Sequence, residues 1–176
     1  MTVDLAFDTM ADKKFLTVMA VFDSETQEKL AKIQSEIIDR VGKGTQTMGI
    51  PFHLTLGSYP TDAEAEVCER IRHVASAFKS FEISLKKYGS FGDRVLFLEP
   101  NIPKELLCLR KNFECDYANG FEWVPHATLF CGAGDELERA RAILPKIDEP
   151  IKTKIVGIEL GEFFPPRKII RIDFNF

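Results

Sequence analysis

The pattern of apolar and polar residues divides the chain into short strands and amphipathic helices. Short apolar runs, and runs in which apolar and polar residues alternate, are typical of buried and half-buried β-strands. Such runs predict strands over residues 15–22, around His53, over 81–85 and 95–98, around His126, and over 151–160 and 168–176. Between them, apolar residues at helical spacing predict helices that begin near residues 24, 61, 101 and 135.

Candidate caps mark the starts of these helices. Three residue pairs match the capping box, in which a polar cap is followed three residues later by Glu or Gln: Ser24 with Gln27, Thr61 with Glu64, and Asp135 with Glu138. Asn101 is the candidate cap of the third helix. The resulting order, β-α-β-α-β followed by β-α-β-α-β-β, predicts an α+β fold made of two similar halves.

The two halves share a short motif, His-x-Thr-Leu. It occurs at residues 53–56 and again at 126–129, so the two histidines lie 73 positions apart. In a strand, residues i and i+2 face the same side. Each copy is therefore expected to present one imidazole and one hydroxyl on one face, and its apolar residues on the other. Two halves related by a pseudo-twofold axis would bring the two copies together at that axis.

These side chains suit phosphoryl chemistry. A histidine titrates near neutral pH and can give or take a proton. A threonine beside it can donate a hydrogen bond to an oxygen atom on which negative charge grows. The motifs thus predict the catalytic residues His53, Thr55, His126 and Thr128, which would supply an acid, a base and two oxyanion donors.

With these paired motifs, the chain resembles the two-histidine (2H) phosphoesterases, which include the 2'-5' RNA ligase-like proteins and the cyclic nucleotide phosphodiesterases. Trp123-Val124-Pro125 before the second histidine, the stretch 89–100 and the closing strands also fit this family. The resemblance implies a pseudo-twofold, bilobed fold, with two antiparallel sheets around a central cleft and helices on the outside. We expect one domain over residues 1–176, with repeats at about 15–90 and 93–176, and a loose arm over 1–13.

Composition and charge limit the cellular location and the kinds of partner to be expected. With 176 residues and 45 % hydrophobic residues, the chain can bury a sizeable core. It has no apolar run long enough to span a bilayer and no signal-like N-terminus, so no membrane partner and a cytoplasmic location are expected. None of the four cysteines forms a C-x-x-C pair, and reduced thiols are expected; a Cys108–Cys115 bridge is the alternative. The net charge of −4 argues against sequence-independent binding of long nucleic acid, which depends on a basic surface.

Other side chains are weaker candidates. Tyr59, Phe91 and Trp123 could stack on a base, and Arg167 could contact phosphate, so these four are the candidate substrate-binding residues. For each, core packing or a solvated charge is the competing interpretation. His73 lacks a threonine partner, and no catalytic role is expected for it. No cofactor or metal is expected, because two histidines without nearby ligands make a poor metal site.

The predicted function is that of a metal-independent phosphodiesterase. It would hydrolyse a 2',3'-cyclic phosphate or a 2'-5' linkage of a nucleotide or RNA end, with His126 as base and His53 as acid, and the protein is expected to be a monomer. Three alternatives stay open: a ligase-like activity, a non-catalytic module that binds nucleotides or RNA ends, and two ordinary strand histidines. Family members that resemble the bacterial RNA ligase branch often carry a basic residue soon after the second motif. Phe130-Cys131-Gly132 stands there instead, which favours a small substrate.

Overall fold

The computed structural model describes residues 13–118 and 122–175. The strands are β1 (Phe15–Phe22), β2 (His53–Tyr59), β3 (Phe81–Phe91), β4 (Val95–Pro100), β5 (Ala127–Cys131), β6 (Ile151–Phe163) and β7 (Arg167–Asp173). The helices are α2 (Ser24–Val41), α3 (Glu64–Ala77), α4 (Lys104–Lys111) and α5 (Asp135–Ala142), and a 3₁₀ turn over Thr61–Ala63 precedes α3. Every strand and helix predicted from the apolar pattern is present, in the predicted order. The arm expected over 1–13 lies, except for Lys13, outside the described residues.

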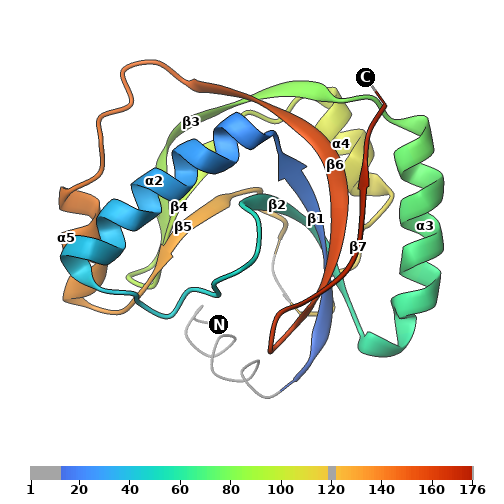
Figure 1. Ribbon diagram of the computed structural model, residues 1–176, viewed down its shortest axis with the longest axis horizontal. Coiled ribbons are helices and arrows are strands. Elements are labelled where there is room, and N and C mark those ends of the chain that lie inside the picture. Colours follow the sequence, from blue (N-terminus) through green and yellow to red (C-terminus); the bar gives the residue numbers. More distant parts are fainter. Residues whose placement is uncertain (1–12, 119–121, 176) are drawn as a thin grey trace.

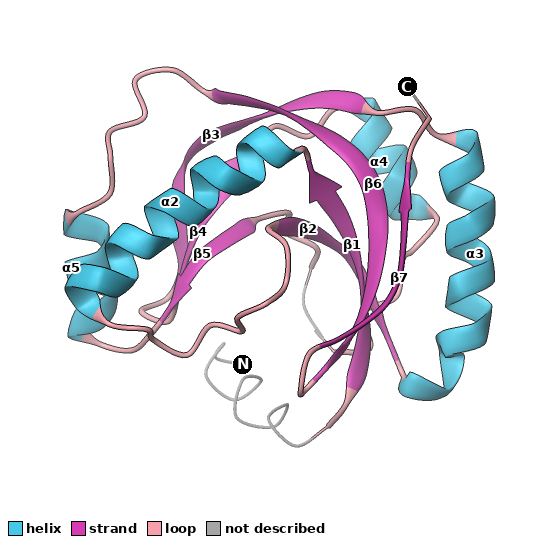
Figure 2. Cartoon of the chain, viewed as in Figure 1, coloured by secondary structure: helices cyan, strands magenta, loops and turns pink. Residues whose placement is uncertain are grey.

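The strands form one antiparallel sheet, in the order β2-β1-β6-β3-β4-β5, with β7 beside β6. The expectation of two separate sheets is wrong, because Phe81–Leu85 of β3 pairs with Ile151–Ile155 of β6 and makes the sheet continuous. The sheet curves so that its ends, β2 and β5, lie near each other (Figure 1). Helices α2 and α5 pack together on one side of the molecule and α3 lies on the other (Figure 2). The predicted α+β class, with antiparallel strands and outer helices, is confirmed.

Helix α2 begins with a cap that the sequence pattern places one residue too late. Its N-cap is Asp23, whose carboxylate accepts a hydrogen bond from the Thr26 backbone N–H at 2.8 Å. The helix ends at Val41, and its C-cap is Gly42, whose φ of 121° suits glycine. The prediction of Ser24 with Gln27 as a capping box is therefore wrong, because Asp23 satisfies the first turn and leaves Gln27 for another contact.

The other predicted caps are also wrong. Neither α3 nor α5 has a side-chain cap, so the pairs beginning at Thr61 and Asp135 do not form capping boxes. Asn101 does not cap α4; its side-chain oxygen accepts from the Ser84 backbone N–H at 2.6 Å and so ties the end of β4 to β3. A three-residue pattern of polar residues cannot distinguish a cap from a contact made by the tertiary fold.

Two further expectations concern the thiols and the membrane. All four cysteines are free thiols in the structure, as expected, and Cys108 and Cys115 are not bridged. Among the described residues, none of the helices has the length and apolar character needed to cross a membrane.

Candidate active site

The two motifs lie at the facing ends of the curved sheet. His53 is the first residue of β2, and His126 directly precedes β5. The apolar residues of the motifs, Leu54, Leu56, Ala127 and Leu129, are fully buried in the core. The histidines and threonines are half-buried, as expected for the opposite face of each strand. The alternation predicted from the sequence is confirmed in both copies.

Each imidazole is held by the carbonyl two residues before it. Nδ1 of His53 lies 2.8 Å from the Pro51 carbonyl oxygen, and Nδ1 of His126 lies 2.7 Å from that of Val124. A carbonyl can only accept a hydrogen bond, so Nδ1 must carry the proton in both rings. In the neutral imidazole this leaves Nε2 as the atom that can accept a proton. The two histidines thus share one tautomer as well as one motif.

Both rings are harder to protonate than an ordinary histidine. Desolvation by the surrounding protein and, to a lesser degree, the positive charge of His126 lower the pKa of His53 to about 4, against the opposing effect of the Pro51 carbonyl. Desolvation also lowers the pKa of His126, again opposed by its carbonyl partner. The charge of one ring is therefore felt by the other, and both rings are neutral in the free protein near neutral pH.

Two phenylalanines pack against the second histidine. The Phe91 ring stands perpendicular to the His126 ring with centroids 4.8 Å apart, and the Phe97 centroid lies 5.2 Å from it. This apolar surround accounts for the desolvation of His126. Phe91, a predicted substrate-binding residue, is thus at the site and in contact with a histidine. Phe97 was not predicted, because a phenylalanine inside a strand is typical of a core residue.

The outer edge of β2 is covered by residues of the C-terminal half. The Trp123 indole N–H donates to the Thr55 carbonyl at 2.8 Å, and the Arg110 guanidinium donates to the Leu56 carbonyl. Further along, the Ser58 N–H donates to the Cys115 carbonyl at 2.7 Å. A Cβ added to Gly57 would lie 2.0 Å from the Phe113 carbonyl oxygen, so glycine is needed for this close approach.

The outer edge of β5 is covered in turn by residues of the N-terminal half. Gln34 of α2 donates to the Leu129 carbonyl at 2.8 Å, and the Thr45 N–H donates to the Cys131 carbonyl at 2.7 Å. The Cys131 N–H donates to the Gln46 side chain at 3.3 Å. Each half therefore supplies the hydrogen-bond partners of the strand that carries the other half's motif.

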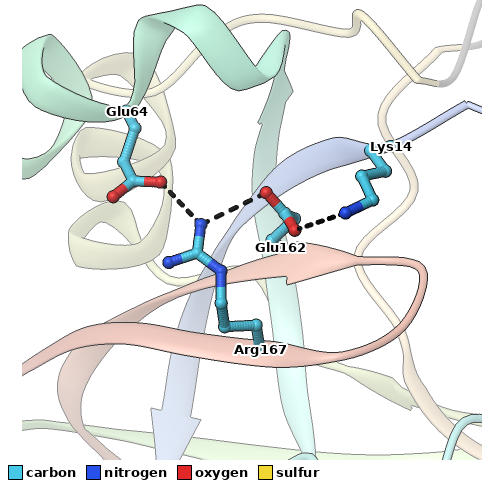
Figure 3. Close-up of polar contacts among 4 residues, drawn as sticks. All are labelled: Lys14, Glu64, Glu162 and Arg167. Carbon is cyan, nitrogen blue, oxygen red and sulfur yellow. Dashed lines mark hydrogen bonds and ion pairs between the residues drawn. The ribbon is translucent and has the colours of Figure 1, made fainter.

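The remaining predicted substrate-binding residues, Tyr59 and Arg167, are engaged by other side chains. Tyr59 is 6 % exposed, belongs to the core cluster and accepts a hydrogen bond from Arg70, so it is not presented to a ligand. Arg167 binds Glu64 of α3 at 2.7 Å and Glu162 of β6 at 3.2 Å, and Glu162 also binds Lys14 at 3.5 Å (Figure 3). His73 is exposed on α3, as expected.

A hollow of about 240 Å³ lies beside the first motif. Pro51, whose carbonyl holds His53, lines it together with Met19 of β1, which stands opposite Thr55. Arg167 and Lys168 of β7 line it as well. Arg167 is therefore at this hollow, with its charge already engaged by two carboxylates. Within residues 13–118 and 122–175, no group of three His, Cys, Asp or Glu residues is arranged to hold a metal ion.

The sequence interpretation missed the residues that support the motifs from outside. Gln27 matched a capping box, Gln34 lies on a polar flank of α2, and Arg110 is a charged residue within the amphipathic helix α4. The signal for Gln27 and Gln34 is their spacing of seven residues, which places them on one side of a helix. Only the fold shows that this side lies against both motif strands.

Comparisons with known proteins agree with this architecture. The family model described as the 2'-5' RNA ligase superfamily matches residues 60–162, more than half of the chain, and one described as LigT-like phosphoesterase matches residues 21–97. The first match includes His126 and the second includes His53. The sequence matches no curated protein significantly.

Solved structures share the fold over nearly their whole length. TT0787 of Thermus thermophilus is 16 % identical with a TM-score of 0.62, and the match covers 91 % of this chain and 97 % of that one. The apo form of E. coli LigT is 16 % identical with a TM-score of 0.57, and the match covers 93 % and 98 % of the two chains. E. coli LigT complexed with 3'-AMP gives the same four values. The fold, both family models and the paired motifs agree, and the chain belongs to the 2'-5' RNA ligase superfamily.

Proposed function

We propose that this protein is a metal-independent phosphodiesterase that hydrolyses a 2',3'-cyclic phosphate or a 2'-5' linkage of a nucleotide or RNA end. The observation that carries the proposal is the matched pair of imidazoles. Each is anchored through Nδ1 to a backbone carbonyl, so each can use Nε2 for proton transfer. An acid and a base that act on one phosphate ester each need a ring nitrogen available for proton transfer, whereas residues that only bind the ester do not.

The reaction would proceed in line at phosphorus. One Nε2 takes a proton from water as the water oxygen bonds to phosphorus. The bond from phosphorus to the ribose oxygen breaks, and the other Nε2–H gives its proton to that oxygen. Thr55 and Thr128 donate hydrogen bonds to the non-bridging oxygens as their negative charge grows. The products are a phosphate monoester and a free ribose hydroxyl.

The pKa values favour one assignment of acid and base. Desolvation is the main cause that lowers the pKa of His53 to about 4, so near neutral pH this ring is neutral and able to take a proton. We therefore favour His53 as the base and His126 as the acid, the reverse of the assignment made from the sequence. A bound phosphate anion raises the pKa of both rings, which would let His126 hold its proton at neutral pH.

The hollow beside Pro51 would accept the part of the substrate next to the phosphate. Its lining combines the apolar Met19 with Arg167 and Lys168, whose charges are paired with Glu162 and Glu159 of the same lining, which suits the sugar or base of a nucleoside better than a further anionic group. A nucleotide substrate is consistent with the 3'-AMP complex of E. coli LigT.

A panel of 2',3'-cyclic nucleotides and 2'-5' dinucleotides tests the proposal. Hydrolysis of at least one substrate is expected, with loss of activity in His53→Ala and in His126→Ala. A pH–rate profile with two limbs would reflect the base and the acid. Binding without turnover across the whole panel would support the binding-module alternative, and joining of RNA ends would support the ligase alternative.

A further inference from the structure

A hydrogen bond links the segment just before the second motif to the first motif. Trp123 lies three residues before His126 in the C-terminal half, and its indole N–H donates to the backbone carbonyl of Thr55 at 2.8 Å. Thr55 is the proposed oxyanion donor of the N-terminal half. The contact therefore fixes the start of the second motif against the middle of the first.

The Thr55 carbonyl lies on the outer edge of β2, next to a β-bulge. Thr55 pairs with Met19 of β1 and Gly57 pairs with Val18, so Leu56 has no partner residue in the ladder. A bulge of this kind disrupts the local hydrogen-bond pattern and turns the strand. The carbonyls of Thr55 and Leu56 are then bound from outside the ladder, by Trp123 and by Arg110.

Arg110 holds the indole in place. Its guanidinium carbon lies 5.5 Å from the centroid of the Trp123 ring, within the range of a cation–π contact. Arg110 is only 5 % exposed, and it is fixed by further hydrogen bonds to the Phe113 carbonyl at 3.1 Å and to the Asp116 carboxylate at 2.9 Å. A cation fixed in this way leaves the tryptophan little freedom to move.

We infer that Trp123, seated on Arg110, is a positioning residue that sets the Thr55 hydroxyl relative to His126. The inference rests on the proposed function and departs from the sequence-based expectation that Trp123 stacks on a base. The indole N–H is already committed to Thr55, and one ring face lies toward Arg110. What Trp123 supplies is alignment between two groups that act on the same phosphate, and alignment governs the catalytic step more than substrate affinity.

Trp123→Phe is the direct test, because it deletes the N–H donor and still leaves an aromatic ring near Arg110. We expect kcat to fall about 10- to 100-fold while KM changes by less than about twofold. Trp123→Ala should lower kcat at least as far. Tyr117→Phe, which alters an exposed aromatic residue of the same segment, is the matched control and should leave both constants unchanged.

A second measurement is independent of turnover. Trp123 is the one tryptophan in the chain, so a single indole N–H resonance is expected by NMR. In the wild-type protein it should be protected from exchange with solvent, and Arg110→Lys, which removes the planar fork, should weaken that protection. An unprotected indole N–H in wild type would overturn the inference.

The outcomes separate the two proposals. Wild-type protein that is inactive on the whole substrate panel would overturn the proposed function and the positioning role with it. Active wild type with an unchanged kcat in Trp123→Phe would overturn the positioning role alone. An increase in KM with kcat unchanged would also overturn it, in favour of base stacking.

Discussion

The side-chain amide of Gln27 binds both backbone polar groups of Phe52. Its Nε2 donates to the Phe52 carbonyl at 2.7 Å, and its Oε1 accepts from the Phe52 N–H at 2.8 Å. Phe52 lies between Pro51, whose carbonyl holds the imidazole of the first motif, and His53 itself. Helix α2 therefore fixes the short backbone segment that orients His53.

Gln27→Glu should show this role with almost no change in volume. The carboxylate can still accept from the Phe52 N–H, but it places an oxygen against the Phe52 carbonyl in place of a donor. We expect a loss of about 1–3 kcal/mol in the free energy of unfolding, measured in urea, and a lower kcat. Glu28→Gln, the reverse change at an exposed neighbour on α2, is the control and should change neither. Unaltered turnover in Gln27→Glu would mean that the segment holds His53 without help from α2.

Replacing the proposed catalytic groups should separate activity from stability. His126→Ala removes a proton-transfer group and should lower kcat about 10²–10⁴-fold, and Thr128→Val removes one oxyanion donor and should lower it about 10²–10³-fold. The melting temperature should change little. The free energy of unfolding should fall by only about 0.5–1.5 kcal/mol in His126→Ala, for the lost contact with Phe91. His73→Ala, at the exposed histidine of α3, should retain full activity. A large drop in melting temperature with activity retained would instead indicate a purely structural pair of histidines.

Stability should fall as the pH is lowered through the range in which histidines titrate. A histidine whose pKa is lowered by folding binds fewer protons in the folded state than in the unfolded state. Its contribution to the free energy of unfolding is therefore fully present above about pH 6.5. That contribution is lost as the pH falls toward the folded pKa of His53, about 4. The lowered pKa of His126 acts in the same direction. The free energy of unfolding of the wild-type protein, measured in urea, should fall between pH 7 and 5. This dependence on pH should be weaker in a His53→Ala, His126→Ala double variant and unchanged in His73→Ala.

Activity should survive exhaustive chelation. The acid, the base and both oxyanion donors of the proposed reaction are side chains of the protein, so no step calls for a metal ion. Turnover measured before and after treatment with EDTA should agree within error. Activity that disappears with EDTA and returns with Mg²⁺ or Mn²⁺ would replace this mechanism with metal-assisted hydrolysis.

The features predicted from the sequence are those set by local periodicity. The alternation of His53, Leu54, Thr55 and Leu56 indicates which side chains face the core, and it is visible in the sequence without knowledge of tertiary contacts. Contacts between distant segments have no such local signal. Asp23 caps α2 in place of Ser24 because its carboxylate also binds the Lys154 N–H of β6, 131 positions away. Tyr59 and Trp123 are both aromatic residues near a motif, and only the fold buries one in the core and turns the other toward Thr55.

Because each half covers the edge strand of the other, β2 or β5, neither half should fold well without its partner. A fragment ending near residue 92 would keep β2 but lose Trp123, Arg110 and Cys115, leaving a bare strand edge that invites pairing with other molecules. The complementary fragment would lose Gln34, Thr45 and Gln46 and expose β5 in the same way. We therefore expect each fragment to aggregate alone and the two to recover a folded complex when they are refolded together. The duplicated unit would then be a repeat in sequence whose copies have become obligate partners.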